Sequence, residues 1–236
     1  MKTLLSALFL SALTATPAMA GAVTGWTATD GFGAVPLAKG RSVLDVRINA
    51  NMAGNSVAAP VMNIVTGAAD GIELGLGTTL SSNPTRAAID NVYPWLRAAL
   101  PFSTETVKTG FMIGGILPAA NSTSEALPGV TGLMDLVTGP VTTGINLGYS
   151  RGLSSQTNWG AANVNFTLPF AGLTWYEEQF VNVPMGGNSN GGVRGSAIIP
   201  VSETVACDVT PALLWTNDPT GTTWTFSPNV GLTMLF

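Results

Sequence analysis

The 236-residue chain contains no histidine and a single cysteine, Cys207. Without histidine it lacks the general base on which Ser-His and Cys-His hydrolases depend, and one thiol cannot build a His/Cys zinc site. A single cysteine also excludes an intrachain disulfide. These absences favour a protein that is not an enzyme and that needs no metal or other cofactor.

Charge is also scarce. Charged residues make up 9% of the chain, against about 25% in typical globular proteins. The 9 basic and 13 acidic residues offer no basic surface for nucleic acid. Hydrophobic residues nevertheless reach 46%, and after residue 20 no apolar run approaches the roughly 18 residues of a spanning helix. This combination is typical of a membrane β-barrel, where every backbone group pairs between strands.

The first residues have the pattern of a secretory signal peptide. Lys2 supplies a positive charge, residues 4–13 form a short apolar core, and Ala18-Met19-Ala20 resembles a cleavage site. We therefore expect residues 1–20 to be removed on export, so that Gly21 begins the mature chain.

Apolar and polar residues alternate through most of the remaining chain. In residues 43–50, for example, Leu44 and Ile48 share one face of a strand and Asp45 and Arg47 share the other. The polar faces are short and mostly uncharged, whereas the outer face of a soluble sandwich would carry Lys and Glu. The expected strands are 43–52, 57–66, 71–80, 92–101, 107–117, 129–138, 141–150, 159–168, 172–182, 193–200, 203–215 and 223–236.

Turns of two lengths separate these strands, which is typical of bacterial barrels with short periplasmic turns and longer outside loops. The sequence therefore predicts an all-β fold, a transmembrane antiparallel β-barrel of about twelve strands formed by residues 41–236. Ten strands is the alternative. Residues 21–40 are rich in glycine and poorly patterned, and we expect them to form an amino-terminal arm or plug.

The chain ends on an alternating strand, in which Val230, Leu232, Met234 and the terminal Phe236 share one face. This pattern resembles the carboxyl-terminal β-signal of bacterial outer-membrane proteins. The resemblance implies that the barrel-assembly machinery binds this strand and that the strand closes the barrel against the first. We accordingly expect the protein in the outer membrane of a Gram-negative bacterium, surrounded by outer-membrane lipid.

Most aromatic residues with a polar tip fall near the ends of the expected strands, as in the interfacial girdles of membrane barrels. They are Trp26, Tyr93, Trp95, Tyr149, Trp159, Trp175, Tyr176, Trp215 and Trp224.

If the apolar faces contact lipid, the opposite faces line a lumen. The expected lining residues are Asp45, Arg47, Glu73, Asn146, Asn163, Asn165, Glu178, Arg194 and Asp208. Buried charges persist only when paired or hydrated. Two interpretations therefore stay open: ion pairs and amides that fill a narrow barrel, or a wet pathway whose charges position a small solute. The adjacent Glu177 and Glu178 point to opposite faces of a strand and cannot flank one substrate bond.

Three segments resemble the outer-membrane proteins associated with the meta-pathway of phenol degradation. They are VTGAADGIELGLG (65–77), KTGFMIGGILPAAN (108–121) and GINLGYS (144–150). The Pro-Thr-Gly that usually follows the fifth strand in that family is replaced here by Pro118-Ala119-Ala120. The resemblance implies a passive outer-membrane channel whose solutes include aromatic or other hydrophobic compounds.

The leading functional hypothesis is thus an outer-membrane channel for small solutes. One alternative is a structural or adhesive barrel that transports nothing and acts through its outside loops. Another is a soluble secreted β-sandwich, which the low charge content disfavours.

Overall fold

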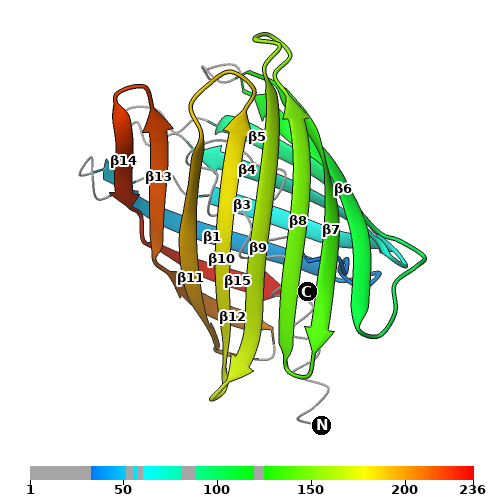
Figure 1. The fold of residues 1–236 in the computed structure, drawn as a ribbon. Coiled ribbons are helices and arrows are strands. Elements are labelled where there is room, and N and C mark those ends of the chain that lie inside the picture. The colour runs from blue at the N-terminus through cyan, green and yellow to red at the C-terminus, as the bar shows by residue number, and fades with distance from the viewer. Residues whose placement is uncertain (1–32, 52–55, 58–60, 81–88, 120–124, 203) are drawn as a thin grey trace.

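All regular secondary structure in the described part of the chain is β-strand (Figure 1). The computed structural model describes residues 33–51, 56–57, 61–80, 89–119, 125–202 and 204–236. The expected signal peptide and residues 21–32 of the expected arm lie outside these ranges. No helix among the described residues is long and apolar enough to cross a membrane.

The strands form one antiparallel barrel with twelve crossings, because two crossings are each split into two strands. β12 and β13 are separated only by Pro211, and β14 and β15 only by Ser227 and Pro228, while β2 is a two-residue extension of the first hairpin. The predicted twelve-strand barrel is therefore confirmed, and the ten-strand alternative is wrong. The strands are β1 (Ser42–Asn51), β2 (Ser56–Val57), β3 (Val61–Ala69), β4 (Ile72–Leu80), β5 (Ile89–Ala99), β6 (Val107–Pro118), β7 (Leu127–Thr138), β8 (Val141–Arg151), β9 (Asn158–Phe170), β10 (Leu173–Pro184), β11 (Asn190–Pro200), β12 (Val205–Thr210), β13 (Ala212–Asp218), β14 (Gly221–Phe226) and β15 (Asn229–Leu235).

The last strand closes the barrel against the first. β15 pairs with β1 from Leu235 opposite Val43 to Asn229 opposite Asn49, and its other edge pairs with β12. The terminal residue continues this ladder: Phe236 N donates to Ser42 O at 2.8 Å, and Ser42 N donates to Phe236 O at 3.2 Å. The chain is therefore hydrogen-bonded to its final residue.

Several strand boundaries differ from the predicted ones. The second crossing was expected at 57–66, but β3 extends to Ala69 because the turn falls at Asp70 and Gly71, where Gly71 adopts a φ of 72°. The strand expected at 92–101 occupies 89–99. The last two crossings are interrupted because Pro211 and Pro228 have no N–H to donate to a ladder.

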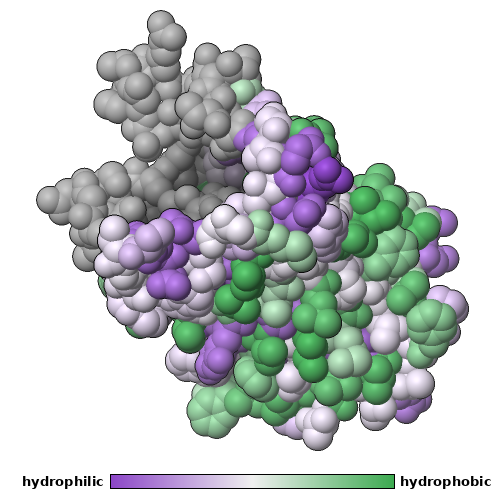
Figure 2. All heavy atoms as spheres, turned by 45° about the horizontal axis from the view of Figure 1, so that its top comes forward, coloured by the Kyte–Doolittle hydropathy of each residue, from purple (hydrophilic) through white to green (hydrophobic). Residues whose placement is uncertain are grey.

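The outer wall of the barrel is apolar. Large hydrophobic side chains such as Ile48, Leu74 and Leu147 point outward and are between 47% and 64% exposed. Figure 2 shows hydrophobic residues gathered over the side of the barrel with few hydrophilic ones among them. A continuous apolar surface of this extent is typical of a wall that contacts lipid.

The aromatic residues divide between the two faces, which partly corrects the predicted girdle. Trp175, Trp224 and Tyr149 are exposed on the outer side, but Tyr93 and Trp95 are buried inside the barrel. Tyr176 is also buried, because it shares a strand face with Glu178. Trp26 lies outside the described residues.

A glycine makes room for the Trp95 ring inside the barrel. A Cβ placed on Gly75 would lie 1.9 Å from Trp95 Cε2, whereas one placed on Gly132 would meet its nearest atom, Leu147 O, at 3.9 Å. We expect Gly75→Ala to lower the free energy of unfolding by about 1–3 kcal/mol, because the ring must move. The matched Gly132→Ala should change it by less than about 0.5 kcal/mol. Urea titration in detergent measures both, and equal midpoints would contradict the packing described here.

Candidate functional site: the polar layer inside the barrel

The nine predicted lining residues all lie inside the barrel, and each is at most 5% exposed. They share this interior with Asn63, Arg97 and Asp135, which the sequence analysis did not single out. We call these twelve side chains the polar layer. Among the buried residues of the described chain, five carboxyl groups and three guanidinium groups lie in this layer, so acidic groups outnumber basic ones.

The first cluster of the polar layer bridges the seam that closes the barrel. Arg47 of β1 contacts Asp45 Oδ2 through Nε at 2.9 Å and Asp208 Oδ1 of β12 through Nη1 at 2.9 Å. Asn63 Nδ2 and Thr233 Oγ1 donate to the two oxygens of Asp45 at 3.0 and 3.1 Å. The cluster thus joins the first, second, eleventh and twelfth crossings through buried, charge-assisted contacts.

The second cluster lies across β9, β10 and β11. Arg194 Nε is 3.0 Å from Glu178 Oε2, and Asn163 Nδ2 donates to the other oxygen of the same carboxylate. Asn165 Nδ2 in turn donates to Asn163 Oδ1 at 3.0 Å. The Arg194 guanidinium also lies 4.6 Å from the centre of the Phe180 ring, within the range of a cation–π contact.

The third cluster occupies β4 and β5. Glu73 is ion-paired with Arg97, and its Oε1 accepts a hydrogen bond from Trp95 Nε1 at 3.3 Å. Strand alternation would have found Arg97, because it lies two residues from Trp95 and shares its face. The predicted girdle obscured this signal, since it placed Trp95 at an interface with lipid.

The clusters on β4–β7 also bind the backbone of residues 33–38, which we call the lumen segment. Leu37 N donates to Glu73 Oε2 at 2.8 Å, and Ala34 N donates to Asp135 Oδ2 at 2.7 Å. Arg97 Nη1 donates to Gly33 O at 2.8 Å. Ala34 and Leu37 pack in a buried apolar cluster whose other members come from the inner faces of β1, β3 and β5–β7. The barrel wall therefore holds the segment through hydrogen bonds to its backbone and through apolar contacts with these two side chains.

The predicted assembly residues lie on β15 or at its end. Val230, Leu232 and Phe236 are exposed on the outside of the barrel, and Met234 is partly buried. Their apolar side chains thus continue the outer surface down to the end of the chain. Among the described residues, no group of three His, Cys, Asp or Glu is placed to hold a metal ion.

At the opposite end of the barrel from the chain terminus, Glu125 joins two loops. Its Oε2 accepts hydrogen bonds from Ser154 N at 2.9 Å and Ser155 N at 2.8 Å, and its Oε1 accepts one from the Ser155 hydroxyl at 2.6 Å. The hydroxyl and N–H of Ser155 stabilise the carboxylate and lower the pKa of Glu125 below its ordinary value of 4.5.

The lowered pKa predicts how the loop contact depends on pH. A lowered pKa in the folded state gives stability that is present above the ordinary pKa and is lost as the pH falls through the lowered one. We expect the amides of Ser154 and Ser155 to be protected from hydrogen exchange at pH values above the ordinary pKa of Glu125, and to lose that protection as the pH falls through its lowered pKa. The Glu125→Gln variant, measured at the same pH values, separates the titration of Glu125 from the general effect of pH on hydrogen exchange. If the difference in amide protection between the two proteins does not change with pH, the contact described here is excluded.

No protein-family model matches the chain, and no curated protein matches it in sequence. Among solved structures, it resembles an outer membrane channel from Pseudomonas putida F1 with a TM-score of 0.63 and 9% identity, over 86% of this chain and 97% of that one. It also resembles the NanC porin, with a TM-score of 0.60 and 10% identity, over 81% and 98% of the two chains.

A third similar structure is the KdgM porin, with a TM-score of 0.54 and 11% identity, over 81% and 98% of the two chains. At such low identity these likenesses establish the fold alone. The chain has the architecture of a porin-like antiparallel barrel. The comparisons do not show the resemblance to the phenol-degradation family.

Proposed function

We propose that the protein is an outer-membrane channel for the passive passage of small solutes. One observation carries the proposal: a barrel with an apolar outer wall encloses a layer of charged and amide side chains contributed by most of its strands. Lipid explains the outer wall, and polar residues inside a membrane barrel with eight buried charged residues among them are typical of a pathway for solutes.

The proposed orientation follows from the lengths of the connections. Short turns at Asp70–Gly71, Gly139–Pro140 and Ala171–Gly172 lie at the end of the barrel where the chain terminates, and these would face the periplasm. The longer connections between β6 and β7 and between β8 and β9 would face outward. The outward-facing residues of β15 would be the surface recognised by the barrel-assembly machinery, after export through the signal peptide.

The described conformation would be a closed state of this channel. Each side chain of the polar layer is at most 5% exposed, so water has almost no access to the three clusters. The lumen segment occupies the interior beside β4–β7, and it would act as a plug. Solute passage would require this segment to move.

The charged and aromatic side chains inside the barrel also favour particular classes of solute. Its excess of carboxylates over guanidinium groups would favour cationic or neutral solutes over anions. The buried rings of Tyr93, Trp95 and Phe180 would suit aromatic or hydrophobic compounds, the solutes implied by the phenol-degradation resemblance.

Solute efflux from vesicles tests this function. The mature protein, folded into vesicles loaded with small dyes of equal size and opposite charge, should release the cationic dye faster than the anionic one. A heat-unfolded sample serves as the control. A folded barrel that releases neither dye would contradict the proposal.

A second candidate function is that of an adhesive barrel acting through its outer loops. The observation that favours it is the contact of Glu125, two residues before β7, with Ser154 and Ser155 of the connection between β8 and β9, which defines a part of the outer surface. Under this hypothesis Glu125→Gln would weaken cell-surface adhesion, whereas solute efflux would be absent from the unmodified protein.

A further inference from the structure

The outer wall of β10 carries two polar side chains in an otherwise apolar surface. Trp175, Glu177 and Gln179 alternate with buried residues and are exposed on the outside of the barrel. Glu177 lies between Phe166 of β9 and Gly195 of β11. In the described part of the chain, Gln179 Nε2 donates a hydrogen bond to Oε1 of the Glu177 carboxylate at 3.3 Å. No cation neutralises it there.

Glu177 lies close to the short-turn end of the barrel. It is five residues beyond Gly172 of the Ala171–Gly172 turn, which corresponds to a height of roughly 12 Å for a tilted strand. The exposed ring of Trp175 lies below it, where an aromatic residue marks the boundary between lipid and water. A carboxylate at this depth is unfavourable in lipid unless it is paired with a cation or hydrated.

An apolar groove begins at Gln179 and extends away from this boundary. It has a volume of about 330 Å³ and opens on the outer wall of β9, β10, β11 and β13. Its lining includes Ala162, Val164, Gln179, Val181, Val193 and Trp215. The Trp215 ring lies over Gly191, where a Cβ would be 2.7 Å from the ring, and so forms one side of the groove.

We propose that Glu177, Gln179 and this groove bind one phospholipid of the periplasmic leaflet whose headgroup carries a primary ammonium group, as ethanolamine does. The ammonium would donate charge-assisted hydrogen bonds to the Glu177 carboxylate, and an acyl chain would lie in the groove above it. The arrangement has the order of a lipid in that leaflet, with its charge near the boundary and its chain toward the membrane centre. The proposal rests on the membrane location proposed above, but not on conduction.

Two features select this headgroup among common lipids. A choline headgroup has the same charge but no N–H, so it cannot donate a hydrogen bond to Glu177. A glycerol headgroup leaves the lipid anionic and would be repelled by the carboxylate. Ethanolamine alone of the three supplies both the positive charge and the donors.

Native mass spectrometry of the mature protein tests the proposal. The protein is extracted from vesicles containing equal parts of phosphatidylethanolamine, phosphatidylcholine and phosphatidylglycerol, after its folded state is verified by heat-modifiable gel migration. We expect one retained phosphatidylethanolamine, with about tenfold preference over phosphatidylcholine, the factor given by a hydrogen bond to a charged group. Glu177→Gln, which keeps the side-chain size, should abolish the preference, and Ala162→Trp should lower retention of all three lipids by filling the groove.

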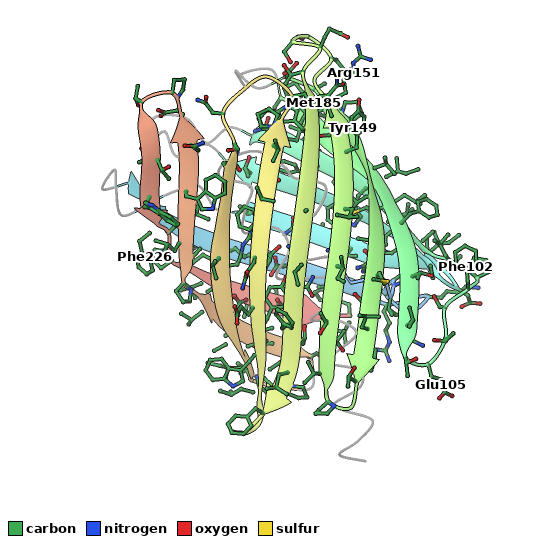
Figure 3. The ribbon with its side chains drawn as sticks, in the orientation of Figure 1. Phe102, Glu105, Tyr149, Arg151, Met185 and Phe226 are labelled. Atoms are coloured by element: carbon green, nitrogen blue, oxygen red, sulfur yellow. The ribbon has the colours of Figure 1, made fainter. Side chains whose placement is uncertain are left out.

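The matched control is Glu105→Gln, which removes the same charge from the exposed turn between β5 and β6 (Figure 3). It should retain phosphatidylethanolamine as the unmodified protein does. Equal retention of the three lipids, or an unchanged preference in Glu177→Gln, would overturn the proposal. A dimer of the unmodified protein that is absent from Glu177→Gln would also overturn the proposal, because a second copy of the chain, and not a lipid, would then cover the groove. A barrel that conducts nothing but keeps this preference would contradict only the channel function.

Discussion

Deletion of residues 21–38 from the mature protein should convert a channel with rare conductance steps into one with stable steps. The lumen segment fills part of the interior and is held by Glu73, Arg97 and Asp135. Its removal leaves the Glu73–Arg97 ion pair in place, so the barrel wall keeps its own contacts. Single-channel recording in planar bilayers measures the change.

The control for this deletion is Leu37→Ala. The wall holds the lumen segment through the backbone N–H of Leu37, and this substitution keeps that hydrogen bond. We expect the variant to stay closed, although it loses apolar contacts in the interior. If the deletion variant folds, as judged by gel migration, yet conducts no better than the unmodified protein, the segment is not a plug.

Arg47→Met should be the most destabilising single substitution in the polar layer. It leaves the carboxylates of Asp45 and Asp208 buried at the closing seam without their shared cation. Removing one partner of a buried ion pair costs about 3–5 kcal/mol. Urea titration of the detergent-folded barrel should show this loss in the free energy of unfolding.

Two comparison variants separate the effect of buried charge on stability from the effect of lost packing. The triple variant Asp45→Asn, Arg47→Met, Asp208→Asn removes all three charges and should recover most of the stability, since neutral replacements of buried ion pairs are often tolerated. Arg151→Met, at the exposed rim of the barrel (Figure 3), should change the stability by less than about 0.5 kcal/mol. A triple variant as unstable as Arg47→Met would show that the loss comes from packing.

The barrel could be predicted from the sequence because its pattern is local. Side chains alternate with a period of two, so each strand such as residues 43–50 assigns its own inner and outer face without knowledge of its neighbours. The same rule placed Glu177 and Glu178 on opposite sides, and the structure has Glu178 buried and Glu177 exposed. The alternation of short turns and long loops favoured about twelve crossings and left ten as the alternative.

The contacts within the polar layer join residues that are far apart in the sequence. The alternation of side chains does not indicate which of these residues meet. Arg47 meets Asp208 only because β15 closes the barrel between β1 and β12. The lumen segment has no periodic pattern, so its partners Glu73 and Asp135 could not be inferred from it. Pro211 and Pro228 interrupt two crossings that alternation alone predicts as continuous.

We expect the outer wall of the barrel to contact lipid and its interior to be shielded from lipid. Two neighbouring residues of β9 test this directly: Val164 is exposed on the outside, and Asn163 is buried inside. In a Cys207→Ser background, Val164→Cys and Asn163→Cys are each labelled with a small fluorophore in urea, then folded into vesicles of brominated lipid. We expect strong quenching at position 164 and little at position 163. Equal quenching at both positions, or none at either, would contradict this expectation.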